Sequence, residues 1–380
     1  MDKILINAIT IKEGGGAVVF IKTLNEMLQL EKNCDWIIII DEALLSQINR
    51  NDKVIMLTFP WIKKSPLHFL YWNEFVLPKL IKKMDVDCVF SQVNTLPFRG
   101  LSCFTFLSIL HAGYFSEEFE MLNSKYNPSF RSKIGWWIRK KWVYLSIKKA
   151  TKVVTPTEAL KNEIRTRLKL NENKIISIYP GAGLAEGNAV RKTYYPKNIW
   201  RIGYITKYGV QKNFDVLFKA VAELKLQTIN FKLVLTLDEK HAPFQLVNSL
   251  IKQYGIADLI ENHGELDAAQ LKNLYSTLDL FVFPSLCESI GFTLLEAMHY
   301  GIPVISANIS SSRELLGNSG VFFQSLDHVD LVREIIAVLR NKTLYENLSA
   351  YNIDRCRLYS WEKSAQNTLT ILKELTCVSS

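Results

Sequence analysis

The sequence lacks the paired cysteines that structural zinc sites and disulfide frameworks use. Its six cysteines are scattered along the chain, and none belongs to a Cys-x-x-Cys pair; they are Cys34, Cys88, Cys103, Cys287, Cys356 and Cys377. Scattered thiols are typical of proteins from a reducing compartment, where disulfides are rare. We therefore predict reduced core cysteines and no structural zinc.

Long apolar runs are also absent. No stretch reaches the roughly 18 uncharged apolar residues that a membrane span needs. Met1-Asp2-Lys3 leads directly into an apolar strand, without the hydrophobic region and cleavage site of a signal peptide. We expect a cytoplasmic protein, and peripheral contact with the inner face of the cytoplasmic membrane stays open.

Several catalytic motifs are missing. The sequence has no Gly-x-Gly-x-x-Gly fingerprint, no Walker lysine loop, no Ser-His-Asp order and no zinc-ligand cluster. One Asp-x-Asp sequence, Asp85-Val86-Asp87, precedes an apolar strand, which is the wrong end of a parallel sheet for catalysis. We therefore expect no metal ion and no other cofactor, and a nicotinamide dehydrogenase is disfavoured.

Cations outnumber anions. The formal net charge is +9 and the pI is about 9.0. Such an excess favours an acidic partner, namely a nucleotide, an anionic lipid or a nucleic acid, although it also fits an ordinary soluble basic protein. Of the 380 residues, 48% are apolar, which is enough for a large core. At about 100–200 residues per domain, two domains are expected.

Short apolar runs alternate with helical stretches along most of the chain. These runs lie at residues 3–8, 35–41, 87–91, 104–110, 152–155, 200–205, 231–236, 259–261, 280–284 and 303–307. Such alternation predicts βαβ units, which form parallel sheets with helices on both faces. The expected fold class is therefore α/β with doubly wound, Rossmann-like sheets.

The alternation breaks once, where residues 181–198 become polar and rich in glycine. We interpret residues 184–198 as a linker between a first domain, residues 1–183, and a second domain, residues 199–364. Ligands of doubly wound sheets bind at the carboxyl ends of the strands. Two facing sheets would place a site in the cleft between them.

Three consecutive glycines follow the first strand. Gly14, Gly15 and Gly16 precede a helix expected at residues 17–30. Glycines let a backbone approach a ligand closely, and the amides of a helix N-terminus bind phosphate. Gly15 and Gly16 are therefore candidate contacts for a phosphate or sugar, although the same sequence also fits a flexible loop.

The segment 281–303, FVFPSLCESIGFTLLEAMHYGIP, is the most informative part of the chain. An apolar strand ends near residue 284, a loop carries Glu288, and a helix begins near Phe292. That helix stops at Gly301, since Pro303 cannot continue it. Glu288 is thus expected at the ligand-binding end of the sheet, and Glu296 in the first turns of the helix.

The start of the same helix is expected to bind an anion. The backbone amides of Ile290, Gly291 and Phe292 would point at a diphosphate leaving group, because a helix N-terminus carries a partial positive charge. The carboxylates of Glu288 and Glu296 also fit a structural role, in which they stabilise the helix N-terminus electrostatically.

Basic residues follow the strand at residues 200–205. Lys207 and Lys212 lie between that strand and an amphipathic helix, where a lysine can neutralise departing phosphates. Both also fit solvated surface lysines. His111 ends the apolar run at residues 104–110, and this strand-end position makes it a candidate, although a lone histidine often has a packing or capping role.

Residues 131–152 interleave cations with aromatic side chains. A basic, tryptophan-rich helix suits an anionic membrane surface, and it also fits a partly buried helix with a solvated basic edge. Nucleic-acid binding is disfavoured, because no recognised nucleic-acid module accompanies the stretch. The candidate membrane or acceptor contacts are Trp136, Trp137, Arg139, Lys140, Lys141 and Trp142.

Several segments together resemble glycosyltransferase family 4. In the second half they are GEL (264–266), LKNLY (271–275), DLFVFPS (279–285), ESIGF (288–292), LEAM (295–298) and GIPVIS (301–306). ATKVVTPTEAL (150–160), KIISIYPGAG (174–183) and YSWE (359–362) are similar to further motifs of that family. The resemblance is strong over residues 200–365 and weak over residues 40–150, where such enzymes bind varied acceptors.

The resemblance implies a GT-B fold, in which a C-terminal helix, here residues 365–380, crosses back onto the first domain. It implies that Glu288 contacts the transferred sugar, that Glu296 binds the ribose and that Lys212 holds the diphosphate. It also implies a donor cleft lined by Gly15 and Gly16.

Further contacts follow from the same resemblance. His111 would face the donor sugar, and the backbone near Gly264 and Leu266 would select the base. The family usually has an arginine just after the strand, where this chain has Gly203-Tyr204. Lys207 takes that place provisionally, as a point charge without the arginine fork.

The expected function is a retaining, metal-independent glycosyltransferase, that is, a hexosyltransferase. The donor would be a UDP-, GDP- or dTDP-sugar, and the acceptor a glycan or polyprenyl-linked glycan. The IKEGGG opening at residues 11–16 resembles enzymes of bacterial O-antigen, lipopolysaccharide or capsule synthesis. The alternatives are a non-catalytic nucleotide-sugar-binding or membrane scaffold protein of this fold, and a sugar-nucleotide epimerase.

Overall fold

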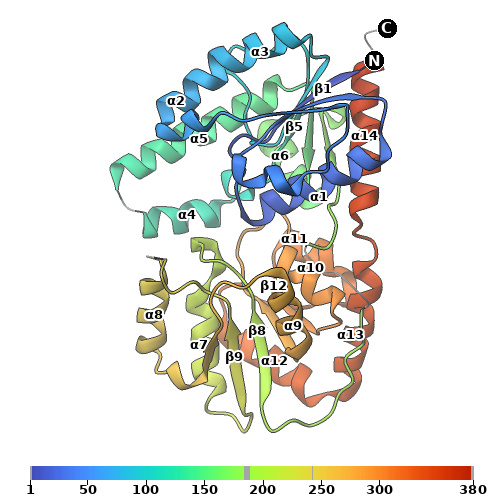
Figure 1. Cartoon of the computed structure of the whole chain (residues 1–380). Helices are drawn as coiled ribbons and strands as arrows, with labels where there is room; N and C mark the ends of the chain where they lie inside the picture. Colours follow the sequence, from blue (N-terminus) through green and yellow to red (C-terminus); the bar gives the residue numbers. More distant parts are fainter. Residues whose placement is uncertain (1, 128, 184–188, 242, 378–380) are drawn as a thin grey trace. The chain divides into compact units, whose positions relative to one another are not determined.

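The computed structural model describes residues 2–127, 129–183, 189–241 and 243–377. The chain forms two units, which Figure 1 shows with the sequence coloured from blue to red. Unit 1 comprises Met1–Phe115, Asn127–Gly181 and Tyr359–Ser380, and unit 2 comprises Ser116–Tyr126 and Ala182–Leu358. Each unit is built around one parallel sheet.

Unit 1 contains a seven-stranded sheet in the order β3-β2-β1-β4-β5-β6-β7, with every pair parallel. Its inner strands are buried on both faces, which explains their near-continuous apolar sequences, whereas the edge strand β3 is partly exposed. They are β1 (Lys3–Asn7), β2 (Asp35–Ile39), β3 (Val54–Leu57), β4 (Cys88–Ser91), β5 (Phe104–Ser108), β6 (Lys152–Thr155) and β7 (Ile175–Ser177).

Helices connect and cover these strands. They are α1 (Gly14–Leu30), α2 (Pro66–Tyr71), the π-helical turn η3 (Trp72–Val76), α3 (Leu77–Met84), α5 (Phe130–Lys149), α6 (Glu158–Leu168) and α14 (Trp361–Cys377). Short turns of 3-10 helix are η1 (Glu42–Gln47), η2 (Pro60–Lys64), η4 (Ala112–Tyr114) and η5 (Glu172–Lys174). Crossover connections of this kind are the standard way to join parallel strands.

The last helix, α14, packs against the first helix, α1 (Figure 1). Ala365, Leu369, Leu372 and Leu375 recur every three or four residues, so they form one buried face in the same core cluster as Phe20 of α1. The prediction that the C-terminal helix crosses back onto the first domain is therefore confirmed. Of the predicted helix at residues 365–380, positions 378–380 lie outside the described residues.

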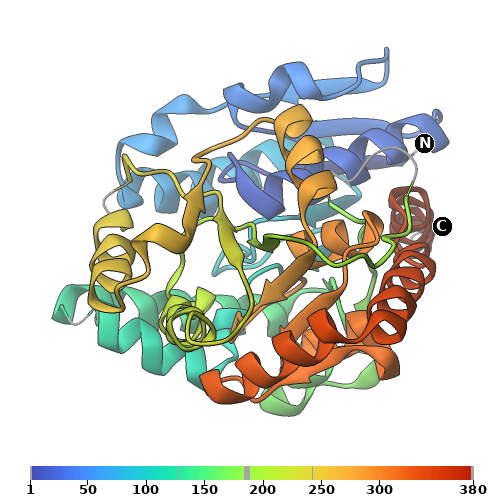
Figure 2. The ribbon, with the colours of Figure 1, turned by 90° about the horizontal axis from the view of Figure 1, so that it is seen from below.

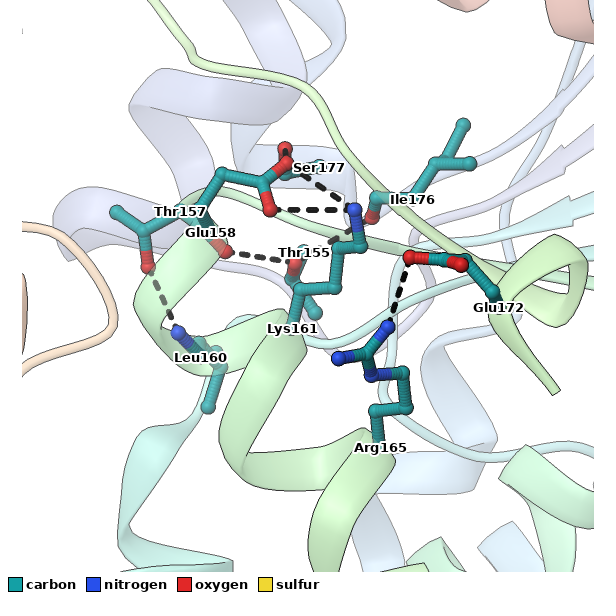
Figure 3. A network of polar contacts seen from close by, with 9 residues as sticks. All are labelled: Thr155, Thr157, Glu158, Leu160, Lys161, Arg165, Glu172, Ile176 and Ser177. Carbon is teal, nitrogen blue, oxygen red and sulfur yellow. Dashed lines mark hydrogen bonds and ion pairs between the residues drawn. The ribbon is translucent and has the colours of Figure 1, made fainter. Parts of the chain in front are cut away.

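A polar network holds the β6–α6–β7 part of unit 1 (Figure 3). Thr157 caps α6, since its hydroxyl accepts a hydrogen bond from the amide of Leu160 at 3.3 Å. Glu158 forms a hydrogen bond with Ser177 and an ion pair with Lys161 at 3.1 Å. These contacts fix the start of α6 at the carboxyl ends of β6 and β7.

Unit 2 contains a six-stranded parallel sheet in the order β10-β9-β8-β11-β12-β13. Its strands are β8 (Trp200–Tyr204), β9 (Phe231–Leu235), β10 (Ile260–Asn262), β11 (Leu280–Phe283), β12 (Val304–Ala307) and β13 (Val321–Phe323). Its helices are α4 (Glu117–Tyr126), α7 (Phe214–Leu224), α8 (Phe244–Gln253), α9 (Ala268–Thr277), α10 (Phe292–His299), α11 (Ser310–Leu316), α12 (His328–Arg340) and α13 (Lys342–Cys356). The 3-10 turns are η6 (Val210–Lys212), η7 (Ala257–Leu259) and η8 (Gly317–Ser319).

One face of this sheet is covered by α7, which Figure 2 shows nearly end-on between α8 and α12. The apolar residues of α7 recur at helical spacing, as the sequence predicted, and Phe214, Leu217, Phe218 and Val221 are all buried. Because α7 packs against both α8 and α12, the side chains of its apolar face are almost wholly buried.

The predicted linker is anchored on unit 2 wherever the structure describes it. Residues 184–188 lie outside the described residues. Beyond them, the amide of Lys192 donates to Ser349 Oγ at 2.7 Å and the Tyr194 hydroxyl donates to the carbonyl of Leu339 at 3.0 Å. Lys197 forms an ion pair with the buried Asp279. The described part of the linker, from residue 189 onward, therefore runs along α12 and α13 and belongs to unit 2.

The predicted α/β fold with two doubly wound sheets is confirmed, and the differences are local. The predicted apolar runs did not include β3, β7 or β13, which are short strands at sheet edges, although β7 lies within the segment KIISIYPGAG of the family resemblance. Helix α1 begins at Gly14, so the three glycines form its first turn and no separate loop. Helix α4, which we placed in the first domain, groups with unit 2.

Candidate functional site

The candidate site lies where the strand order of unit 2 reverses. Strands β8 and β11 are parallel neighbours, with Leu280 opposite Ile202. The chain leaves β8 toward β9 and β10, and it leaves β11 toward β12 and β13. At such a switch point the two connections diverge and leave room for a ligand at the carboxyl ends of the strands. Residues 205–213 and 284–291 form these two connections.

Lys212 and Glu288 meet at this switch point. Their side chains form an ion pair of 2.6 Å between Nζ and Oε1, and each side chain is only about one seventh exposed, at 16% and 14%. A pair this sheltered from water interacts more strongly than a surface pair. The structure therefore brings together the two residues that the sequence analysis placed on separate segments.

Tyr204 anchors the loop that carries Lys212, residues 205–213, which we call the lysine loop. This residue is fully buried, and its hydroxyl donates to the carbonyl of Lys212 at 3.0 Å and contacts Ser285 Oγ at 3.1 Å. Burial raises the pKa of the Tyr204 phenol far above its ordinary value, so the side chain stays neutral. Tyr204, near the position where related enzymes carry an arginine, supplies a support and no positive charge.

Asn213 fixes the end of the same loop. It adopts a left-handed backbone conformation with φ of 54°, which asparagine tolerates better than most residues. Its amide nitrogen donates to the carbonyls of Pro284 at 3.2 Å and Ser325 at 2.8 Å. The amide of Leu286 also donates to the carbonyl of Gln211 at 2.9 Å. The two connections of the switch point are thus bonded to each other.

Helix α10 begins at the same place. Gly291 is its N-cap residue and offers no side-chain oxygen to the first amides of the helix. A Cβ at Gly291 would lie 3.0 Å from the ring of Phe283, so the helix start packs closely on β11. Ile290 is buried and Phe292 is half-buried. The electropositive end of α10 therefore lies beside Glu288, where an anion would be favoured.

Glu296 lies one turn further along α10, and it is almost fully buried. Its Oε2 accepts a hydrogen bond from the hydroxyl of Tyr275 at 2.7 Å. Burial raises the pKa of Tyr275 well above its ordinary value, which keeps the hydroxyl a donor. Gly183 lies against the same carboxylate, since a Cβ at that position would be 2.4 Å from Oε1. Tyr275 and Gly183 thus fix how Glu296 can bind a ligand.

Lys207 forms an ion pair with a different carboxylate from the one that Lys212 contacts. Its Nζ is 3.0 Å from Glu265 Oε1, and both side chains are exposed. Glu265 lies between Gly264, with φ of 70°, and the half-buried Leu266, just after β10. Lys207, which we assigned provisionally to the place of the family arginine, therefore contacts residues 264–266, the segment that we expected to select the base.

His111 belongs to unit 1, where it follows β5 and caps η4. Its Nδ1 accepts a hydrogen bond from the amide of Gly113 at 3.1 Å, so the neutral ring carries its proton on Nε2. Its ring lies 4.7 Å from that of Tyr114 and 5.8 Å from that of Trp136. Burial lowers the pKa of His111 to about 4, and the nearby Arg139 contributes to this shift.

This pKa predicts a specific loss of stability in mild acid. An unfolded histidine has a pKa of about 6.5, so the unfolded state gains a proton first as the pH falls. The stability from the neutral ring is complete above about pH 6.5 and is lost between pH 6.5 and about 4. Urea unfolding at steps from pH 7 to pH 4.5 should show this loss in the wild type and a flatter profile in His111→Gln.

Measurements above pH 4.5 separate the effect of His111 on stability from that of the carboxylates. Glu31 and Glu158, for example, have pKa values lowered from 4.5 by ion pairs or hydrogen bonds, so they destabilise the protein only at lower pH. Equal slopes in the wild type and in His111→Gln between pH 6.5 and 4.5 would contradict the prediction.

The glycines at the start of α1 are largely open to solvent. Gly15 is exposed and Gly16 is half-buried, and a Cβ at Gly16 would meet no atom within 4 Å. Gly14 has φ of 74°, so it is the glycine whose backbone conformation requires that residue type. The packing of unit 1 itself does not explain why positions 15 and 16 lack side chains.

The six candidate membrane or acceptor residues of α5 separate into two groups. Trp136 stacks on Tyr114 at 4.9 Å, and Trp142 stacks on Phe98 at 4.8 Å and donates from Nε1 to the carbonyl of Leu96. These two tryptophans therefore pack within unit 1. The solvent-facing members are Trp137, Arg139 and Lys141, together with the half-buried Lys140.

A cavity of about 370 Å³ lies on the other side of the lysine loop in unit 2. Its walls are mostly apolar and come from α4, α7, α8, the loop after β8 and the loop after β13, including Met121, Leu250 and Leu326. The charged residues Asp215 and Lys219 at this cavity form an ion pair of 2.8 Å. Such walls suit apolar groups better than a diphosphate.

The described part of the chain contains no group of three His, Cys, Asp or Glu side chains that could hold a metal ion. In the Asp-x-Asp sequence, Asp85 ends α3 with φ of 55°, and Asp87 accepts a hydrogen bond from the amide of Lys3 at 2.8 Å. Both aspartates lie at the amino ends of strands, away from the ligand-binding edge.

None of the helices that the structure describes has the length and apolar content that crossing a bilayer requires.

Sequence reasoning did not find four residues that shape the site. Tyr204 holds the carbonyl of Lys212, and Tyr275 holds the carboxylate of Glu296. Ser285 and Asn213 act less directly, since Ser285 contacts the Tyr204 hydroxyl and Asn213 bonds the lysine loop to Pro284. Tyr204 and Ser285 could have been suspected, because they lie at the ends of β8 and β11 at the switch point. Tyr275 lies in the last turn of α9, and no local signal connects it with Glu296.

Comparison with known proteins gives the family. Residues 14–186 match the model of Glycosyltransferase Family 4, and residues 190–355 match the model of glycosyl transferases group 1. O-antigen chain mannosyltransferase B of Escherichia coli is 28% identical over 176 residues, which is 45% of this chain and 45% of that protein. Serotype-specific mannosyltransferase WbdA of Escherichia coli is 31% identical over 159 residues, or 41% of this chain and 19% of that protein.

The chain matches less than two thirds of the length of these curated relatives. Solved structures are similar over nearly the whole chain. A glycosyltransferase from Rickettsia africae has 18% identity and a TM-score of 0.70, with 98% of each chain covered. HepE from Anabaena, solved with UDP and glucose, has 16% identity and a TM-score of 0.69, with 98% of this chain and 100% of that chain covered.

At such identities the structural comparison shows the fold, and the two matching families show the kind of protein. Their boundary, between residues 186 and 190, follows shortly after the start of unit 2 at Ala182. The chain belongs to the GT-B glycosyltransferases, with a family 4 sequence in its N-terminal half and a group 1 sequence in its C-terminal half.

Proposed function

We propose that the protein is a retaining, metal-independent hexosyltransferase that uses a nucleotide-sugar donor. The observation that supports this most is the sheltered Lys212–Glu288 pair at the switch point of unit 2, beside the start of α10. It combines a cation, a carboxylate and a helix N-terminus at the edge of the sheet where ligands bind.

The donor diphosphate is proposed to bind Lys212 and the first amides of α10. Its negative charge matches both, and it would compete with Glu288 for the lysine ammonium. Glu288 would then be available to accept hydrogen bonds from the sugar hydroxyls, and Glu296 from the ribose hydroxyls. The complex of HepE with UDP and glucose supports a nucleotide-sugar donor, and the Escherichia coli mannosyltransferases support a hexose.

Further donor contacts are proposed from the family resemblance. They are His111, Gly15 and Gly16 for the sugar and phosphates, Gly264 and Leu266 for the base, and Lys207 beside the base. His111 would act as a neutral donor through Nε2, because burial lowers its pKa to about 4 and Nδ1 already accepts a hydrogen bond.

The proposed reaction breaks the bond between the anomeric carbon and the diphosphate oxygen. That oxygen keeps the electron pair, and Lys212 and the α10 N-terminus stabilise the charge as it develops. The acceptor hydroxyl attacks from the same face, and its proton passes to the departing phosphate. Among the candidate carboxylates, Glu288 is given the role of binding the sugar hydroxyls once the diphosphate has taken Lys212, and Glu296 is held by Tyr275, so neither is assigned as a covalent nucleophile.

The acceptor is proposed to be a glycan or lipid-linked glycan of a bacterial surface polysaccharide, at the inner face of the cytoplasmic membrane. The O-antigen mannosyltransferases support this, as does the similarity in fold to the lipopolysaccharide galactosyltransferase WaaB, with a TM-score of 0.66. The membrane part of the proposal also draws on the basic, aromatic sequence of α5.

The first test is thermal stabilisation by a panel of UDP-, GDP- and dTDP-sugars, each with and without EDTA. A true donor should stabilise the protein by about 2–4 kcal/mol at roughly 100–1,000 times its Kd. The stabilising donor is then incubated with glycan acceptors, and NMR identifies the anomeric configuration of the product.

The outcomes separate the candidate functions. An unchanged anomeric configuration supports retention, and an inverted product overturns it. Conversion of the donor in the absence of an acceptor identifies an epimerase. A donor that binds and is never turned over identifies a scaffold protein. Stabilisation that EDTA abolishes contradicts metal independence.

A further inference from the structure

Helix α5 of unit 1 carries apolar side chains on two opposite faces. Its inner face contains Trp136, Val143 and Ile147, and the last two are fully buried. The outer face consists of Phe130, Ile134, Trp137, Ile138 and Leu145 at helical spacing, and all five are exposed. A helix that is apolar on both sides ordinarily has a partner on both sides.

The outer face continues onto α2 and η3, which lie beside α5 in Figure 1. Trp142 links the two parts, because its ring lies 4.8 Å from Phe98 and 5.8 Å from Phe69 of α2. Arg99 lies 5.5 Å above the ring of Phe75, and Phe75 stacks on Tyr71 at 5.5 Å. Trp142 of α5 therefore packs on both α2 and the segment at Phe98, which joins α5 to this neighbouring aromatic group.

We call this region the docking surface. Its apolar members are between 37% and 77% exposed, and they are Leu67, Tyr71, Phe75, Phe98, Phe130, Ile134, Trp137, Ile138 and Leu145. Exposed apolar residues are ordinary when scattered, but a contiguous set of large ones marks an interaction site.

The charge around the docking surface is mostly positive. Helix α5 contains seven lysines and arginines and no acidic residue. Arg131, Lys141 and Lys148 lie on its outer side at the spacing of the apolar residues. The acidic residue of α2 and η3 is Glu74, and it accepts hydrogen bonds from the amide of Phe98 at 2.7 Å and from Asn73. The surface therefore offers cations to a partner.

We propose that the docking surface binds the headgroup region of a membrane that contains anionic lipid. Aromatic and aliphatic side chains would enter the boundary between headgroups and acyl chains, with α5 lying in the plane of the bilayer. Lysines and arginines would reach the lipid phosphates. Lys141 extends over the ring of Trp137, with its Nζ 5.8 Å from the ring centroid, so its charge lies beside a side chain that would insert.

A second copy of the chain fits this surface less well. A symmetric dimer would place the same patch on both sides of the interface, so the cations of one α5 would face those of the other. Like charges that are removed from water in this way destabilise an interface. An anionic lipid surface instead offers opposite charge over the whole patch.

This inference rests on the membrane part of the proposed function and names the residues that would make the contact, and its test requires neither donor nor acceptor. Trp137 and its neighbours on the outer face would insert, whereas Trp136 and Trp142 would stay within unit 1. The structure therefore assigns different roles to three tryptophans of α5 that the sequence presents as equivalent.

The test is co-sedimentation of the full chain with vesicles, in the absence of any nucleotide sugar. One set of vesicles contains phosphatidylcholine alone, and the other also contains phosphatidylglycerol. The wild type should bind the anionic vesicles, and binding should weaken as salt rises, because salt screens the headgroup attraction. Binding should fall at least about tenfold in the pair Arg131→Glu/Lys141→Glu and in the pair Ile134→Ser/Trp137→Ser.

Matched controls make the same changes elsewhere. Leu226→Ser removes an apolar side chain that is 83% exposed in unit 2, and Lys252→Glu reverses an exposed charge on α8. Both should bind vesicles as the wild type does, and every variant is checked for an unchanged Tm. Trp136→Phe should also keep vesicle binding.

Three results would overturn the proposal. They are no binding to anionic vesicles, equal binding to neutral and anionic vesicles, and equal loss of binding in the control variants. A change in oligomeric state of the docking-surface variants, without a change in vesicle binding, would identify the surface as an interface between copies. A protein that binds vesicles and never transfers a sugar would contradict the proposed function alone.

Discussion

Replacing Lys212 with alanine is expected to lower kcat/KM by about 100- to 1,000-fold, which is the usual effect of removing one preorganised charge from a developing anion. Lys212 is sheltered from water beside Glu288 and the start of α10, so its charge acts at short range. The variant should also lose most of the thermal stabilisation by the donor. Steady-state kinetics and donor titrations measure both effects.

Two variants give the controls for Lys212. Lys207→Ala removes an exposed lysine that pairs with Glu265, and it should lower kcat/KM far less. Lys212→Arg keeps the charge and tests whether the compact ammonium matters. The Tm of Lys212→Ala must be measured as well, because the change leaves Glu288 without its cation. Equal losses in Lys207→Ala and Lys212→Ala would contradict the assigned diphosphate contact.

Leu372→Ala is expected to destabilise unit 1 by about 2–5 kcal/mol, the usual cost of a large-to-small change in a core. Leu372 is fully buried, and it belongs to the same core cluster as Phe20 and Leu24 of α1. The free energy of unfolding is measured with urea. Hydrogen exchange at the α1 amides then locates the loss in unit 1, because α14 is the partner of that helix.

The control for Leu372 is a neighbour on the exposed side of α14. Glu374→Ala changes an exposed residue of the same helix, so it should alter the free energy of unfolding by less than about 0.5 kcal/mol. A small effect of Leu372→Ala, with unchanged exchange at α1, would show that α14 contributes little to unit 1.

Much of the fold follows from the order of residues alone. Strands such as β1 and β11 are short runs of buried apolar residues followed by helices, and that alternation is sufficient to predict parallel sheets. Because ligands bind at the carboxyl ends of such strands, the same pattern also marks Lys212 and Glu288 as candidates. Both features depend on neighbours in sequence, which is why they can be read without a structure.

Contacts between distant segments needed the structure. The pairing of Lys212 with Glu288 joins loops 76 positions apart, and Tyr275 reaches Glu296 across 21 positions from another helix. Tyr204 follows the family pattern in position but provides a hydroxyl in place of a charge, and its burial decides that role. No periodicity in the sequence encodes these contacts.

The sequence by itself determined the two-sheet α/β architecture and the segments that carry the candidate site, and its family resemblance implied the crossing of the last helix. The tertiary structure alone decided which side of α5 faces the core, because a helix with apolar residues on both faces has no preferred side until its neighbours are in place. Trp136 packs inward and Trp137 faces solvent for that reason. Local sequence fixes the type of an element, and the packing of distant elements fixes which of its side chains are available for function.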